Sequence, residues 1–198
     1  MAKRDGHAKD GVYHVRSLYF DTPRDRALRE KIDGVNEREK FRIRYYNGDT
    51  SFIRLEKKSK KGGLSEKRSA PLTAREAQRI VDGDVAWLAE SGNALLVELY
   101  AKMRGELLAP KTIVDYTREA FVFDAGNVRV TLDYDIRTGL RSTDFLNPDC
   151  VTIPAGSAAA ILEVKWDEFL PDVIRGAVGL NGRHVSAFSK YAQARIYD

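Results

Sequence analysis

The sequence has few of the residues that build disulfide frameworks and metal centres. Its 198 residues include a single cysteine, Cys150, which excludes an internal disulfide and a cysteine-based zinc site. The three histidines, His7, His14 and His184, form no cluster with metal-ligand spacing, and we interpret them as surface residues. Any metal in this protein is therefore expected to bind through oxygen ligands.

Long hydrophobic runs are also missing. No segment approaches the roughly 20 apolar residues that span a bilayer. The N-terminal stretch MAKRDGHAKDG lacks the apolar centre of a signal peptide. A reducing, cytoplasmic location is the expectation. Internal repeats and low-complexity linkers are absent too, so residues 1–198 are predicted to form one domain, long enough to bury a substantial core.

The excess of positive charge is small, but its placement is informative. The 33 Lys and Arg residues exceed the 29 Asp and Glu residues by only four, which does not by itself indicate nucleic-acid binding. Within segments that resemble β-strands, however, charged residues recur at every second position. The clearest segments are EKFRIRYY (39–46), FIRLEKKSK (52–60), DYTREAF (115–121), NVRVTLD (127–133) and ILEVK (161–165). Because strand side chains alternate between two faces, each segment presents one mainly cationic face and one apolar face.

The coarse pattern is β-rich with inserted helices. Alternating, β-branched and aromatic stretches predict strands over 12–21, 38–46, 51–59, 65–71, 111–123, 127–135 and 158–167. Helices are predicted over 24–33, 73–82 and 93–108, after Pro171 and after Ser189. The third of these places Leu95, Leu99 and Leu107 on one apolar stripe. This order predicts an α+β fold: an antiparallel β-barrel with helices packed outside and at the C-terminus.

Two interpretations of the cationic faces are open. A solvated sheet face is the more common use of a single Arg-x-Arg pair, and edge strands use lysine against aggregation. Two observations favour a polyanion-binding surface instead. The opposite face carries strong core formers such as Ile43 and Leu55, and Glu163 and Lys165 lie in the most apolar stretch of the chain, where unpaired charges are costly. Nucleic acid is a weaker candidate, because stacking aromatics on an exposed basic face would be expected for it.

Seven landmarks, in order, resemble those of VTC domains, the polyphosphate polymerase domains of the triphosphate tunnel superfamily related to CYTH domains. They are SLYFDT (17–22), EKFRIRYY (39–46), RLEKK (54–58), DYTREAF (115–121), NVRVTLD (127–133), ILEVK (161–165) and FSKY (188–191). The resemblance spans residues 12 to 197 approximately. It implies a tunnel barrel whose basic lumen holds a nucleoside triphosphate or polyphosphate, with a divalent metal, commonly Mn²⁺ or else Mg²⁺, on a tunnel glutamate.

The resemblance also implies roles for individual residues. The catalytic cations would be Arg42, Arg44, Lys58, Arg118, Arg129 and Lys190. Further substrate contacts would come from Arg54, Lys67, Tyr116 and Lys165, and the metal ligand would be Glu163. Asp21, Asp133 and Asp135 could add metal ligands, although capping of turns and strand ends is the more common use of such residues.

One departure from the family pattern concerns the N-terminal region. VTC and CYTH domains begin with a further tunnel strand and a helix upstream of the segment that matches SLYFDT, whereas only 11 residues precede Val12 here. Residues 1–11 resemble the loop that follows that helix. The expectation is a barrel without its first strand, and an unpaired edge that a partner chain could cover.

The leading hypothesis is a polyphosphate polymerase-like enzyme that transfers the terminal phosphoryl group of ATP to phosphate or polyphosphate. The alternatives are a tunnel triphosphatase and a non-catalytic module that binds polyphosphate or nucleotides. The expected partners are ATP, polyphosphate and inorganic phosphate, and no nucleic acid. A homo-oligomer or a membrane-bound partner that receives the polymer would be compatible with this sequence.

Overall fold

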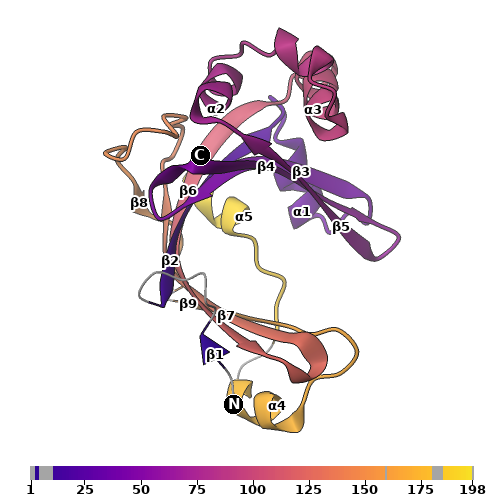
Figure 1. Cartoon of the computed structure of the whole chain (residues 1–198), viewed down its shortest axis with the longest axis vertical. Helices are drawn as coiled ribbons and strands as arrows, with labels where there is room; N and C mark the ends of the chain where they lie inside the picture. Colours follow the sequence, from indigo (N-terminus) through magenta and orange to yellow (C-terminus); the bar gives the residue numbers. More distant parts are fainter. Residues whose placement is uncertain (1–2, 5–10, 159, 180–184, 198) are drawn as a thin grey trace.

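The computed structural model describes residues 3–4, 11–158, 160–179 and 185–197, and one antiparallel sheet of nine strands dominates that part of the chain (Figure 1). The strands are β1 (Lys3–Arg4), β2 (Val12–Asp21), β3 (Arg38–Tyr46), β4 (Asp49–Lys61), β5 (Leu64–Leu72), β6 (Ala109–Phe123), β7 (Val128–Thr138), β8 (Ile153–Pro154) and β9 (Ala160–Lys165). The predicted strands are thus present, several of them longer than predicted.

The sheet runs in the order β5-β4-β3-β2-β6-β7, and β8 and β9 both pair with β7. Among the described residues no pairing joins β5 to β9, so hydrogen bonds do not close the sheet into a complete ring. The predicted α+β, antiparallel architecture is confirmed in this open form. Within the stretch 1–11, interpreted as a loop, Lys3 and Arg4 instead pair with β6; residues 1–2 and 5–10 lie outside the described residues.

The helices are α1 (Arg26–Ile32), α2 (Ala74–Val81), α3 (Ala94–Gly105), α4 (Asp172–Val178) and α5 (Lys190–Ala194), with short 3₁₀ turns at Ala86–Glu90 and Ala125–Asn127. The predicted capping box is present: Thr73 accepts from the backbone N–H of Glu76, and the Glu76 carboxylate accepts from that of Thr73. In the described part of the chain, no helix is long and apolar enough to cross a membrane.

The predicted helix over 93–108 ends earlier than the sequence pattern indicated. Helix α3 stops at Gly105, and Leu107 adopts a left-handed conformation with φ of 56°. Leu107 is 63% exposed and does not belong to the buried stripe, whereas Leu95 and Leu99 do. A left-handed residue commonly terminates a helix, and the following Pro110 disfavours helical geometry at the residue before it.

The two faces of the sheet pack against different helices. Even positions of β2 and odd positions of β3 and β4 form the main apolar core with α2 and α3, and Leu18, Ile43 and Leu55 are fully buried there. A second, smaller cluster on the other face includes Tyr19 and Tyr191 of α5. Figure 1 shows α2 and α3 on one side of the curved sheet and α5 on the other. Strand alternation therefore separates the helix-packed core from the face that carries the cations.

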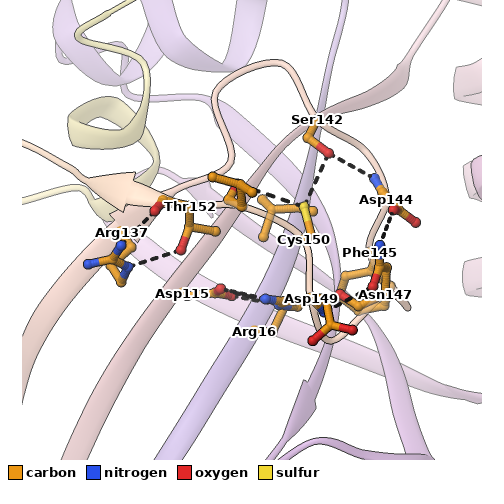
Figure 2. A network of polar contacts seen from close by, with 12 residues as sticks. Arg16, Asp115, Arg137, Ser142, Asp144, Phe145, Asn147, Asp149, Cys150 and Thr152 are labelled. Atoms are coloured by element: carbon orange, nitrogen blue, oxygen red, sulfur yellow. Dashed lines mark hydrogen bonds and ion pairs between the residues drawn. The ribbon is translucent and has the colours of Figure 1, made fainter.

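The loop between β7 and β8 is held on the core side by a polar network (Figure 2). Arg16 donates to both carboxylate oxygens of Asp115 at 2.9–3.2 Å and to the carbonyl of Asn147 at 2.5 Å. The Tyr45 hydroxyl donates to the carbonyl of Phe145 at 3.1 Å. These contacts hold the loop on the same side of the sheet as the main apolar core.

Candidate functional site

A cavity of about 720 Å³ opens on the face of the sheet opposite α2 and α3, and we call it the cationic cavity. It is lined by ten of the eleven predicted site residues. These are Arg42, Arg44, Lys58, Lys67, Tyr116, Arg118, Arg129, Glu163, Lys165 and Lys190. Residues distant in sequence thus meet in one place, because the strands β3, β4, β5, β6, β7 and β9 and the helix α5 carry these ten residues.

Arg54 is the predicted residue that the structure leaves outside this lining. It shares the strand face of Glu56, as alternation requires, but its guanidinium lies 5.0 Å from the ring centroid of Phe52 and donates to the Ser69 hydroxyl at 3.3 Å. The side chain therefore lies along the strand rather than into the cavity.

Glu56 organises the cations of β3 and β5. This carboxylate is only 3% exposed. It accepts two hydrogen bonds from Arg42 at 2.8 and 3.0 Å, and its oxygens lie 3.3 Å from Arg44 Nε and 2.6 Å from Lys67 Nζ. Burial alone would raise the pKa of Glu56, but the charges of Arg42 and Arg44 outweigh it and lower the pKa to about 2. Glu56 thus stays ionised and fixes three cations.

Asp133 has the same role on the other wall. Its carboxylate is fully buried and accepts from Arg118 at 2.6 and 2.8 Å, while Lys190 Nζ lies 2.6 Å away. Burial would raise the pKa of Asp133, but Arg118 and Lys190 lower it. The ammonium of Lys190 also lies 4.7 Å from the ring centroid of Tyr116. Sequence reasoning treated Asp133 as a capping residue or a metal ligand, whereas it is the buried counter-ion of two predicted site residues.

Helix α5 is held in place by contacts behind the cavity. The Tyr191 hydroxyl donates to Asp21 at 2.6 Å, and Arg195 donates to Asp25 at 2.9 Å. Asp21 also accepts from the backbone N–H groups of Ala27 and Leu28 at the start of α1. Asp21 is therefore a capping residue, in agreement with the more common of the two sequence interpretations. These contacts position Lys190 at the start of α5.

Two lysines in the cavity, Lys40 and Lys58, have no ion pair among the residues that the structure describes. Burial lowers the pKa of both; Lys165 lowers that of Lys58 further, and Arg42 that of Lys40. The sequence analysis did not assign Lys40 to the site. The alternating pattern of the sequence does include Lys40, because it lies two residues before Arg42 and shares its strand face.

Tyr19 is a second lining residue that the sequence analysis missed. Its hydroxyl accepts from Arg42 Nη1 at 2.8 Å, and Lys40 Nζ lies 5.8 Å from its ring centroid. Burial would raise the pKa of Tyr19, but the positive charges of Arg42 and Lys40 lower it to about 8. The shift reflects a strongly positive cavity: of the described residues, nine Lys and Arg side chains and one carboxylate, Glu163, line it, while Glu56 and Asp133 pair with lining arginines.

Glu163 is the candidate metal ligand. Its side chain is 42% exposed, lines the cavity and lies 3.4 Å from Lys165 Nζ. No group of three or more His, Cys, Asp or Glu side chains within the described residues is placed to hold a metal. Glu56 and Asp133 are occupied by cations. Among the described residues, a Mg²⁺ or Mn²⁺ ion in this cavity would gain one lining carboxylate, that of Glu163, and would need further oxygen ligands from outside those residues.

Comparison with known proteins places the chain in a family. No curated protein matches the sequence. Among solved structures, it is similar to the PH1819 protein from Pyrococcus horikoshii OT3, with 15% identity, a TM-score of 0.40, and coverage of 90% of this chain and 72% of that one. The VTC domain profile matches residues 2–197, nearly the full length. The chain belongs to the VTC domain family.

Proposed function

We propose that this protein binds a nucleoside triphosphate or polyphosphate in the cationic cavity and transfers the terminal phosphoryl group of ATP to a phosphate or polyphosphate acceptor. The observation that carries the proposal is the convergence of nine Lys and Arg side chains, among the described residues, on one cavity. Membership of a family of polyphosphate polymerase-like, tunnel-fold domains supports it.

The cavity suits phosphoryl transfer because its charges are fixed before the substrate arrives. Phosphoryl transfer needs positioning and charge neutralisation more than covalent help from the protein. Glu56 holds Arg42 and Arg44, and Asp133 holds Arg118, so these guanidinium groups need little reorganisation on binding. A guanidinium offers a planar pair of donors for phosphate oxygens, and a lysine such as Lys58 offers a compact charge.

Glu163 would hold the divalent metal, Mn²⁺ or Mg²⁺, together with the phosphates. When bound, such an ion neutralises charge on the phosphoryl group in transfer. Lys58 lies near enough to Glu163 for that carboxylate to influence its pKa. Lys58, which has no ion pair among the described residues, would contact the phosphates and stabilise their negative charge without taking part in covalent chemistry.

Incubation with ATP and Mn²⁺, followed by separate assays for long-chain polyphosphate and for free phosphate, tests this proposal. Polymer formation is the expected outcome. Release of phosphate alone would indicate the triphosphatase alternative, and tight binding without turnover would indicate a non-catalytic module. Glu163→Gln and Arg42→Ala should each abolish most of the activity. Arg68→Ala is the matched control, because Arg68 bonds to Glu98 outside the cavity. Equal rates in all variants would contradict the assignment of the site.

The remaining expectations about partners follow from this function. Inorganic phosphate and polyphosphate are the proposed acceptor and product, and a cytoplasmic location with access to ATP is proposed with them. A second copy of the chain, or a membrane partner that receives the polymer, would be detected by measuring the molar mass in solution and by co-purification from membranes.

A further inference from the structure

Aromatic rings line the cationic cavity alongside the cations, and two of them lie near the hairpin that joins β3 and β4. Tyr13, Tyr46, Phe52 and Phe188 line the cavity together with the phosphate-binding candidates. Tyr46 ends β3 and Phe52 lies near the start of β4, so both are close to the hairpin turn that joins these strands. We call these four cavity-lining residues the aromatic cluster; within it, the rings of Tyr13 and Tyr46 contact each other with 5.9 Å between their centroids.

Phe52 is the ring in this cluster that offers an open surface. It is 52% exposed. Tyr46, by contrast, packs edge-on against Tyr13 at 5.9 Å between centroids, and the guanidinium of Arg44 lies 4.7 Å from its centroid. Arg54 lies 5.0 Å from the Phe52 centroid, which orients that ring and leaves much of it accessible. A phenyl group that is supported from one side and open on the other is suited to stacking.

The opposite end of the cavity has different chemistry. Along the same face of β3, Tyr46 is followed by Arg44, Arg42 and Lys40, and Lys40 pairs in register with Lys58 of β4. Six residues of strand at roughly 3.3 Å each separate Tyr46 from Lys40, about 20 Å in total. Lys58 lines the cavity together with Lys165 and Glu163 of β9.

Along the β3–β4 wall the cavity is thus polarised: Tyr46 and Phe52 lie at the hairpin end, the Glu56-bound Arg44 and Arg42 lie in the middle, and Lys40 and Lys58, which have no ion pair among the described residues, lie at the far end. An inorganic phosphate chain is charged along its whole length and gains nothing from the rings. A nucleoside triphosphate has a flat base at one end and its terminal phosphate at the other, which matches this order.

We propose that Phe52 is a stacking platform for the base of the nucleoside triphosphate, and that it fixes the direction in which the substrate lies. The triphosphate then runs past Arg44 and Arg42, and the terminal phosphoryl group lies near Lys40 and Lys58. This inference rests on the proposed function. Every base has a π-face, so stacking here gives preference for nucleotides over inorganic phosphate chains without selecting among bases.

The test compares two ligands with the same number of phosphates. Calorimetric titrations with Mn²⁺ present would use the β,γ-imido analogue of ATP and inorganic tripolyphosphate. Both would be titrated into the wild-type chain, Phe52→Ala, Phe52→Trp and the control Val151→Ala. Val151 is 80% exposed and does not line the cavity. Because Phe52 is also largely exposed, Phe52→Ala should fold normally, which a thermal melt would check.

Phe52→Ala should weaken binding of the nucleotide analogue about tenfold or more and leave tripolyphosphate binding unchanged. Phe52→Trp should retain nucleotide affinity, and Val151→Ala should behave as wild type. The inference is overturned if the wild-type chain binds both ligands and Phe52→Ala weakens both equally or neither. If the wild-type chain binds neither ligand, the proposed function fails and the stacking site fails with it.

Discussion

Two adjacent lysines of β4, Lys57 and Lys58, show how one strand serves two purposes. Lys57 points to the helix-packed side, where it bonds to Glu98 of α3 and lies 2.6 Å from Glu39. Burial would lower the pKa of Lys57, but these two carboxylates raise it. Lys58 points into the cationic cavity, has no ion pair among the described residues, and has a pKa lowered by burial and by Lys165. One charge is balanced by the fold, and the other is available to a ligand.

The same difference separates the two charged clusters to which these lysines belong. On the helix-packed side, the three carboxylates of Glu39, Glu98 and Glu106 pair with the three cations Lys57, Lys102 and Arg68, so the charges of this network balance. In the cavity, cations outnumber carboxylates. A balanced network needs no partner, whereas a buried excess of one sign is costly unless a counter-ion binds. Charge balance, rather than charge itself, therefore distinguishes a structural cluster from a binding site.

The largest effect is expected on the free energy of unfolding when Glu56 is replaced. Glu56→Gln removes the negative charge that holds Arg42, Arg44 and Lys67 together, so it should lower the free energy of unfolding by about 3–5 kcal/mol. The matched change on the other side, Glu98→Gln, affects a more exposed network and should cost about 1 kcal/mol. Urea denaturation of both variants measures the difference. Equal losses would show that the two clusters do not differ in the way described.

Lowering the pH should remove the contribution of the Glu56 carboxylate to stability. The pKa of Glu56 is lowered from its ordinary 4.5 to about 2, so its contribution to stability is complete above pH 4.5 and is lost as the pH falls toward 2. A shift of this size corresponds to about 3 kcal/mol. The free energy of unfolding of the wild-type chain should fall through this range, and that of Glu56→Gln should fall less. Parallel curves for the two proteins would contradict the assignment.

Substitution of the two adjacent lysines should affect different properties: ligand affinity for Lys58 and stability for Lys57. Lys58→Met should weaken tripolyphosphate binding by about 2 kcal/mol, because a charge-assisted contact is lost, with no loss of stability. Lys57→Met should lower the free energy of unfolding by about 2 kcal/mol, because Glu39 and Glu98 lose their shared partner, with no change in affinity. Each variant is the control for the other. Titration and urea denaturation of the pair would contradict the comparison if both variants lost the same property.

The smallest effect expected is on the pH dependence of affinity. A bound polyanion favours charged Lys58 and Lys40 and neutral Tyr19. Because the pKa of Tyr19 is about 8 and those of both lysines are lowered, affinity for tripolyphosphate should decline as the pH rises through 8 and above. Tyr19→Phe should remove the part of this decline that centres near pH 8. An affinity that stays constant or rises with pH would argue against these groups facing the ligand.

The sequence predicted the cationic wall well because strand alternation is a local property. Once Arg42, Arg44 and Lys58 are assigned to strands, their shared faces follow without knowledge of the rest of the fold. Which strands meet depends on long-range register, which single segments do not encode. The roles of Glu56 and Asp133 as counter-ions therefore emerged only from the structure, because each accepts from residues on neighbouring strands or on α5.

Other differences have similarly physical causes. Arg54 lies on the cavity face of its strand, but its long side chain turns aside to contact Phe52 of β4 and Ser69 of β5. The periodicity of α3 continues to Leu107, although the backbone leaves the helix after Gly105. Phe52 carried no recognised signal, because an exposed ring on a strand is common and gains meaning only beside Tyr46 and the cavity.

Titration of tripolyphosphate into the wild-type chain, Arg42→Ala and Arg68→Ala tests the central claim most directly. Arg42 lines the cationic cavity, and Arg68 belongs to the balanced network on the other side of the sheet. We expect Arg42→Ala to lose about 3 kcal/mol of binding free energy, roughly a hundredfold in affinity, and Arg68→Ala to bind as the wild type does. Equal affinity in all three proteins, or equal losses in both variants, would contradict the cavity as the polyanion site.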